Sequence, residues 1–116
     1  MVCFTCGRVA VALLFVGAWV VGVARADEPS PIAVTIKDHR FTPSEIDVPA
    51  GKEVVLAIRN EDPSAEEFDL SALGYEQVIA ARDSGIVRLP ALQKGRLYPF
   101  VGDYHSGTAR GVLAAE

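Results

Sequence analysis

The stretch "YPFVGDYHSGTARGVL" (residues 98–113) decides the fold, because it reads as a strand, a polar loop and a second strand. Tyr98 and Phe100 are two residues apart, so their side chains share one face of an extended segment. The loop that follows contains glycine, serine and aspartate, which favour turns, and it carries His105. The apolar run Gly111–Leu113 closes the hairpin. A chain that ends in this way is expected to be built of antiparallel strands.

The preceding sequence shows the same alternation of apolar and polar side chains. Residues 54–60 are the strongest example, with Val54, Leu56 and Ile58 on one face. The segment 60–70 reads as an acidic loop, and residues 71–77 read as a single helical turn. The expected strands are residues 32–37, 45–48, 52–60, 77–81, 85–90, 96–103 and 109–115. Seven or eight short strands with frequent turns predict an all-β fold, a small Greek-key β-sandwich with antiparallel or mixed sheets.

The first 26 residues have the layout of a secretory signal peptide. Arg8 precedes an apolar run of 16 uncharged residues, and Ala24 and Ala26 form a small-residue cleavage site. The alternative is an uncleaved membrane anchor, but the run is shorter than the roughly 20 residues that a spanning helix needs. We expect cleavage after residue 26, a polar lead-in over 27–31 and a single domain over 32–116, in a protein exported to the periplasm.

Cleavage would remove both cysteines and leave 90 residues with 9 basic and 15 acidic side chains, a formal charge of −6. A domain without cysteine has no disulfide and no thiolate, so a type 1 blue-copper centre is not expected. The basic residues are scattered singly along the chain, which predicts no binding of nucleic acid. Burial and strand pairing must therefore provide the stability of this small domain.

Three segments together resemble the cupredoxins: "FTPSEIDVPAGKEVVLAIRN", "NEDPSAEEF" and "LQKGRLYPFVGDYHSGTARGVL". In this comparison His105 matches the second histidine ligand, and Glu66 or Glu67 stands at the first. Gly102 stands where those proteins carry the cysteine ligand, and Arg110 where they carry the methionine. The resemblance therefore implies the cupredoxin fold and retains one of its four copper ligands.

The combination of "DHRFTP", "EEFDL", "YEQVI" and "GDYH" is similar to the EfeO-type, Ftr-associated cupredoxin-like proteins of bacteria. That resemblance implies a periplasmic protein that binds copper or iron. It also implies a role beside an inner-membrane permease for ferrous iron and the periplasmic partners of that permease. The step supported would be the oxidation of Fe(II) before uptake, and the sequence leaves open whether the protein itself is an enzyme.

Under this resemblance three loops meet at one end of the sandwich, and they carry imidazoles and carboxylates. The candidate metal ligands are His105, His39, Glu67, Glu66, Asp103 and Glu76, with Glu76 expected beneath the others. Such nitrogen and oxygen donors suit copper(II), iron, zinc or manganese better than Cu(I). The expected cofactor is therefore a copper or iron ion.

Each candidate residue also has a purely structural interpretation. In that interpretation His105 and His39 are hydrogen-bonded loop histidines, and Glu66 and Glu67 are a solvated acidic pair. Asp103 caps the turn that follows it. Arg110 pairs with the carboxylates and competes with a metal. If these interpretations hold, the alternative function is a metal-free β-sandwich that docks on a membrane permease or another protein.

Overall fold

The computed structural model describes residues 16–18 and 28–116 of the chain. The expected signal peptide, residues 1–26, lies outside the described residues apart from 16–18, and so does residue 27 of the polar lead-in. None of the helices within the described residues has the length and the apolar character needed to cross a membrane.

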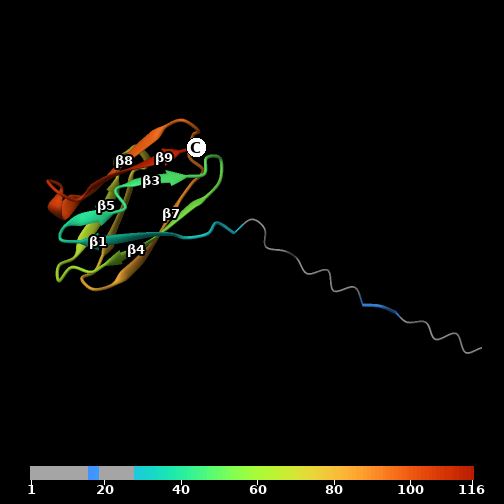
Figure 1. The fold of residues 1–116 in the computed structure, drawn as a ribbon, viewed down its shortest axis with the longest axis horizontal. Helices are drawn as coiled ribbons and strands as arrows, with labels where there is room; N and C mark the ends of the chain where they lie inside the picture. The colour runs from blue at the N-terminus through green and yellow to red at the C-terminus, as the bar shows by residue number, and fades with distance from the viewer. Residues whose placement is uncertain (1–15, 19–27) are drawn as a thin grey trace, which may run out of the picture.

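Residues 32–115 fold into two facing β-sheets (Figure 1). The strands are β1 Ile32–Lys37, β2 Arg40–Thr42, β3 Glu45–Val48, β4 Val54–Asn60, β5 Glu66–Leu70, β6 Tyr75–Ile79, β7 Ser84–Leu89, β8 Leu97–Gly102 and β9 Arg110–Ala115. Two 3-10 turns interrupt them, η1 Ser71–Leu73 and η2 Asp103–His105. The described residues contain no α-helix.

Both sheets are mixed. The smaller sheet has the order β2-β1-β4-β7, in which β1 and β4 are parallel. The larger sheet has the order β3-β9-β8-β5-β6, in which β3 and β9 are parallel. All other neighbours are antiparallel. The prediction of an all-β sandwich is thus confirmed, with nine strands in place of seven or eight.

The two additional strands are β2 and β5, and β5 lies in the segment expected to be an acidic loop. Glu66, Phe68 and Leu70 alternate inward along β5, and all three are buried. The first inward residue is a glutamate, so the apolar residues alone do not show the alternation that is typical of a strand. The strand forms because the structure provides hydrogen-bond donors for this buried carboxylate.

The core between the sheets is centred on three phenylalanines, one from each of β2, β5 and β8. Phe41 meets Phe100 edge to face, with ring centroids 4.9 Å apart. Phe68 lies 5.2 Å from Phe100 and 6.2 Å from Phe41. All three are at most 4% exposed. Aromatic contacts of this kind add to the stabilisation from burial and fix the strands that lead to the loops above them.

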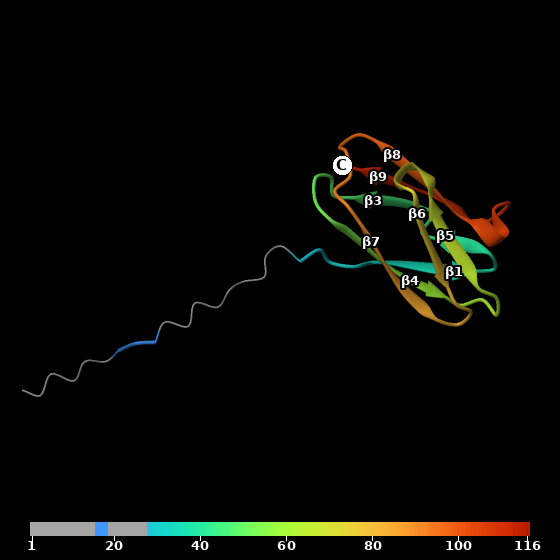
Figure 2. The ribbon, with the colours of Figure 1, turned by 180° about the vertical axis from the view of Figure 1, so that it is seen from behind.

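Three connections lie at the same end of the sandwich, opposite the C-terminus: the β1–β2 turn, the β4–β5 loop and the η2 segment between β8 and β9. They can be followed in Figures 1 and 2, where η2 is the red loop farthest from the chain end. The resemblance predicted that these three loops meet, and they do. We call this part of the molecule the loop end.

Candidate metal site

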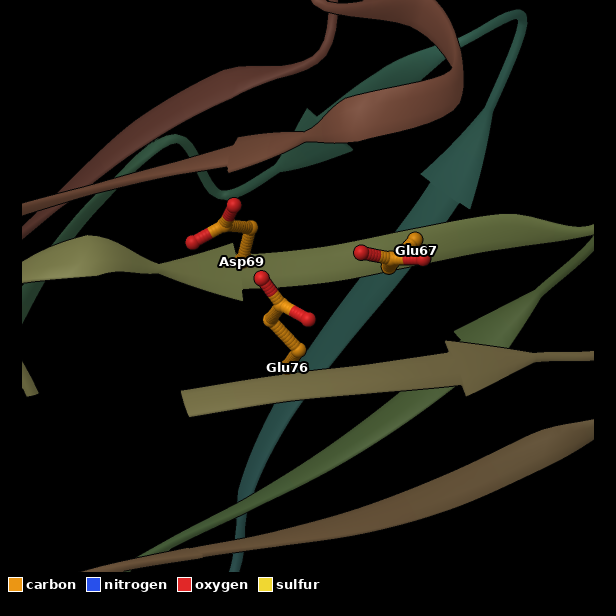
Figure 3. A group of neighbouring side chains, drawn as sticks. All are labelled: Glu67, Asp69 and Glu76. Carbon is orange, nitrogen blue, oxygen red and sulfur yellow. The ribbon is translucent and has the colours of Figure 1, made fainter. Parts of the chain in front are cut away.

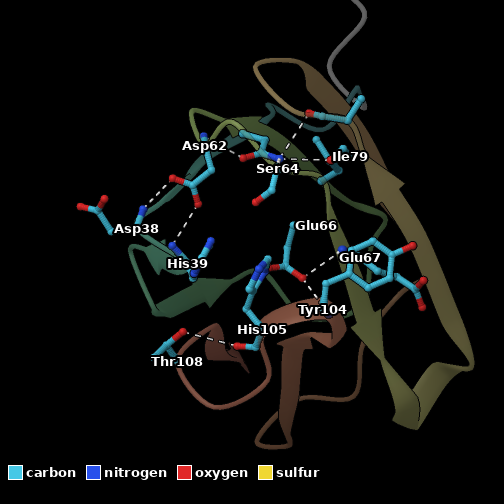
Figure 4. Close-up of polar contacts among 12 residues, drawn as sticks. Asp38, His39, Asp62, Ser64, Glu66, Glu67, Ile79, Tyr104, His105 and Thr108 are labelled. Atoms are coloured by element: carbon cyan, nitrogen blue, oxygen red, sulfur yellow. Dashed lines mark hydrogen bonds and ion pairs between the residues drawn. The ribbon is translucent and has the colours of Figure 1, made fainter.

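Two imidazole rings face each other at the loop end. His39 comes from the β1–β2 turn and His105 from η2, 66 residues later in the chain. Their ring centroids are 3.6 Å apart and the ring planes are inclined by only 9°. Both side chains are partly exposed. Figure 4 shows the two residues among the polar contacts of the loop end. Two ring faces are thus held in contact at a solvent-accessible place.

The buried carboxylate of Glu66 holds the second of these rings. Its Oε2 lies 2.6 Å from Nδ1 of His105, and its Oε1 accepts hydrogen bonds from the backbone N–H groups of Tyr104 and Glu67. Glu66 is only 1% exposed, so these contacts replace the water that it loses on burial. An ionised carboxylate only accepts hydrogen bonds, which assigns a hydrogen to Nδ1 of His105. In the neutral form of this ring, Nε2 carries the lone pair.

Glycine at position 102 makes room for this carboxylate. A Cβ atom built on Gly102 would lie 2.5 Å from Cδ of Glu66 and 2.8 Å from its Oε1, and 2.7 Å from Cβ of Ala109. These distances are shorter than real Cβ contacts. The space beside position 102 is therefore filled by the side chain of Glu66.

The turn that carries His39 has an uncommon backbone conformation. Asp38 and His39 have φ values of 52° and 56°, the positive values that a two-residue hairpin turn of type I′ requires. Asp62, from the β4–β5 loop, accepts hydrogen bonds from both of their N–H groups, at 2.7 Å and 2.9 Å. Burial disfavours the ionised form of Asp62, but these two hydrogen bonds and the nearby histidines outweigh it and lower the pKa of Asp62 below the ordinary 3.8.

The other acidic candidates lie away from the two histidines. Glu67 and Asp69 point outward from β5 and approach Glu76 of the neighbouring strand β6 (Figure 3). One carboxylate oxygen from each lies within 4.8 Å of the others. Asp103 is exposed at the start of η2. The structure thus brings His39, His105 and Glu66 together, whereas Glu67 and Glu76 belong to a separate group on the outer face of the larger sheet.

Tyr104 stands between the buried Glu66 and this outer group. Its backbone N–H donates a hydrogen bond to Oε1 of Glu66, and its hydroxyl lies in the field of the Glu67 carboxylate. Desolvation of the hydroxyl and the negative charge of Glu67 raise the pKa of Tyr104 above the ordinary 10.0. Tyr104 therefore remains a neutral hydrogen-bond donor at physiological pH.

Arg110 contacts the backbone of the loop that follows η2. Its Nε donates a hydrogen bond of 2.6 Å to the carbonyl oxygen of Ser106. Among residues 28–116, the ion pairs involve other side chains and none joins Arg110 to a carboxylate. The guanidinium therefore stabilises its own loop and leaves Glu66 to His105.

Two residues that position this site were not among the sequence candidates. Asp62 holds the turn of His39, and Asn60 is fully buried and accepts the N–H of Asp62 through its side-chain oxygen. The sequence signal was the segment "NED", since asparagine and aspartate commonly bond to the backbone two residues away. The partners of Asp62 in the β1–β2 turn lie more than 20 residues away in the chain, and a local sequence pattern does not reveal contacts over that distance.

The donor types fit a metal ion at the two histidines. Because the lone pair of an imidazole lies in its ring plane, the stacked rings would bind one ion together once the ring of His39 turns about its side-chain bonds. Glu66 orients His105 by accepting a hydrogen bond from its Nδ1–H, which is the way carboxylates support metal-binding histidines. His39 provides a second imidazole in contact with the first. The described residues also contain a buried hydroxyl without a hydrogen-bond partner, Oγ of Ser64, in the loop that joins Asp62 to Glu66. Two imidazoles and a buried carboxylate thus lie in direct contact at the loop end.

The fold agrees with the family assignment. The family model for the cupredoxin-like domain matches residues 10–115, and the chain belongs to this family. A curated relative, an uncharacterized protein of Rickettsia prowazekii (strain Madrid E), is 35% identical over 82 residues, which cover 71% of this chain. The alignment spans 65% of the length of that relative.

Solved structures of copper proteins share this fold. One is the metal-binding domain of the Cu(I)-exporting P-type ATPase CopA of Streptococcus pneumoniae D39, solved with Cu(I). Its TM-score is 0.67 with 14% identity, over 76% of this chain and 86% of that one. Auracyanin A, a blue copper protein of Chloroflexus aurantiacus, has a TM-score of 0.63 with 15% identity, over 77% of this chain and all of that one. At these identities the likeness shows the fold alone.

Proposed function

We propose that this chain is a periplasmic cupredoxin-like protein that binds a copper or iron ion through His39 and His105, with Glu66 as the group that orients His105. The observation that carries the proposal is the contact of the two imidazoles, 3.6 Å apart, with the carboxylate of Glu66 on Nδ1 of one of them. A histidine whose Nδ1 donates to a carboxylate presents Nε2 as the metal ligand. Both rings are accessible from solvent, so an ion can reach them.

The donor types indicate which ions this site prefers. Imidazole nitrogens with neighbouring carboxylate oxygens suit Cu(II), Zn(II) and iron, whereas Cu(I) prefers thiolate and thioether ligands. Residues 28–116 contain neither cysteine nor methionine. A copper or iron ion bound here would supply one-electron chemistry, and the carboxylate would favour its more highly charged state. The copper bound by structural relatives makes copper the first ion to test.

We further propose that this protein supports the uptake of ferrous iron, beside an inner-membrane permease and the periplasmic partners of that permease. The support comes from the resemblance to the Ftr-associated proteins and from the leader-like residues 1–26. In that role the bound ion would take part in the oxidation of Fe(II) before permeation. The alternative is a metal-free docking module for the permease or another partner.

Calorimetric titration of the purified protein tests metal binding. Cu(II), Zn(II) and, under anaerobic conditions, Fe(II) are added to the wild type and to His105→Ala. We expect a Kd for Cu(II) below about 1 μM, which corresponds to roughly −8 kcal/mol, and a large loss in the variant. If neither copper nor iron binds more tightly than about 100 μM, metal binding is abandoned.

A cellular assay separates the metal-dependent role from docking. Ferrous-iron uptake is measured in cells that carry, as their sole copy, either the wild type or a His39→Ala, His105→Ala variant, with equal amounts of protein verified by immunoblot. A metal-dependent role predicts loss of uptake in the variant. Uptake equal to the wild type would establish that docking, and not the metal, is what the protein contributes.

A further inference from the structure

The loop that carries Asp62 is a rigid part of the loop end. Asn60 is fully buried, and its side-chain amide donates hydrogen bonds to the carbonyl oxygens of Ser64, Ile79 and Ala80, at 2.9 to 3.3 Å. Its side-chain oxygen accepts the N–H of Asp62. The carbonyl of Asp62 accepts the N–H of Arg82 at 3.1 Å. Asp62 is therefore fixed on both sides before it contacts the β1–β2 turn.

The turn that Asp62 contacts lacks the glycine that such turns usually carry at their second central position. Positive φ at both central positions of a hairpin turn is usual for Asn-Gly, Asp-Gly or Gly-Gly, because glycine has no Cβ atom and adopts positive φ without strain. Here the two positions are Asp38 and His39. One carboxylate accepts both successive N–H groups, an arrangement that requires these two groups to point the same way. The contact with Asp62 thus compensates the strain.

The conformation of the turn decides where the ring of His39 lies. His39 is the second central residue, and β2 begins at the next residue. A change of its backbone angles would rotate its Cα–Cβ bond and move its ring relative to His105. His105 is positioned independently, by Glu66 and by the hydrogen bonds of its carbonyl oxygen to the N–H groups of Thr108 and Ala109. The two imidazoles therefore have separate supports.

We propose that Asp62 is a positioning residue of the metal site: by binding the N–H groups of Asp38 and His39, its carboxylate holds the imidazole of His39 against that of His105 (Figure 4). This inference rests on the proposed metal site for its consequence in function. The geometric part of it, the position of His39, can be measured without metal.

The experiment compares Asp62→Ala and Asp62→Asn with the wild type and with Asp47→Asn, a matched control on the exposed face of β3. Two properties are measured. The first is the proximity of the two rings in the chelator-treated protein, from nuclear Overhauser contacts between the ring protons of His39 and His105. The second is the affinity for Zn(II), which is redox-inactive, by calorimetry. Backbone amide spectra confirm that each variant is folded.

We expect Asp62→Ala to lose the ring contacts and to weaken Zn(II) binding at least tenfold, because a displaced support of a ligand typically costs 10- to 100-fold in affinity. Asp62→Asn keeps one acceptor oxygen and should be intermediate. Asp47→Asn should match the wild type. Retention of the ring contacts and an affinity within twofold in Asp62→Ala would overturn the inference.

A second substitution distinguishes positioning from a general loss of stability. Asp38→Gly removes the strain of positive φ at the first turn position, because glycine adopts it freely. Introduced into Asp62→Ala, it should restore part of the ring contacts and of the Zn(II) affinity, and failure of this rescue in a folded double variant counts against the inference. If the wild type binds none of Zn(II), copper and iron, the proposed function fails, while the ring contacts still decide the role of Asp62. If Asp62→Ala does not fold, Asp62→Asn with and without Asp38→Gly gives the same comparison.

Discussion

Oε2 of Glu66 lies 2.6 Å from Nδ1 of His105, and this pair joins the interior of the sandwich to its loop end. Replacement of Glu66 by glutamine keeps the size of the side chain but removes the charge that orients the imidazole. We expect Glu66→Gln to weaken Cu(II) binding roughly 10- to 100-fold. Calorimetry on the folded variant measures the change.

The adjacent glutamate provides the comparison. Glu67 has the same side chain one residue later, but it points to the outer face of the sheet. Glu67→Gln should leave Cu(II) affinity within about a factor of two, a change of less than roughly 0.5 kcal/mol. The reverse result, with Glu67→Gln the damaging change, would assign the metal to the outer acidic group.

Gly102→Ala should destabilise the fold, because the added methyl group meets Glu66 and Ala109 at 2.5 to 2.7 Å. Overpacking of this kind typically costs about 1–3 kcal/mol. Urea titration gives the free energy of unfolding. In a Glu66→Ala background the same substitution should cost clearly less, since the space is then empty. Equal costs in the two backgrounds would show that Glu66 does not occupy that space.

Asp62 makes the free energy of unfolding decrease at acidic pH. Its folded-state pKa lies below the ordinary 3.8, so the ionised carboxylate stabilises the fold above that pH. The contribution is lost as the pH falls through the lowered pKa. At neutral pH, Asp62→Asn should lower the free energy of unfolding by about 1.5–3 kcal/mol, the value of a hydrogen bond to a charged group. The difference from the wild type should shrink below pH 3.8, in acid titrations followed by circular dichroism with chelator present. A difference that persists undiminished in acid would contradict this assignment.

Tyr104 should titrate at a higher pH than an ordinary tyrosine, because of its desolvation and the charge of Glu67. Glu67→Gln removes that charge and should move the pKa of Tyr104 back toward 10.0. Tyrosinate absorbance, with Tyr104→Phe subtracted to remove Tyr75 and Tyr98, measures the shift. Glu45→Gln on β3 is the control, and an unchanged titration in Glu67→Gln would refute the contact between Glu67 and Tyr104.

The strands that the sequence predicts well are those whose first inward positions are apolar. Val54, Leu56 and Ile58 predict β4 directly, and the final hairpin follows from Tyr98 and Phe100. β5 was missed because its first inward side chain is charged. The alternation of side chains along a strand distinguishes the two glutamates. Glu66 lies on the same face as Phe68 and Leu70, whereas Glu67 lies on the opposite face.

The geometry of the loop end is less accessible from sequence. That His39 and His105 come together followed from the resemblance, but their parallel contact depends on a turn with two positive φ values. Asp38 is a common first residue of such a turn, but His39 stands where glycine usually follows. The cause is Asp62, 23 residues away from His39, and contacts over that distance have no local signature.

Positions 66 and 102 can hold only one functional side chain between them. A cysteine introduced at position 102 would collide with the carboxylate already there, and removal of that carboxylate alone would leave an unfilled hollow in the core and an imidazole without its acceptor. A sulfur-ligated and an oxygen-supported version of this domain are therefore separated by at least two coordinated substitutions. Conversion of one into the other by design must begin with both positions at once.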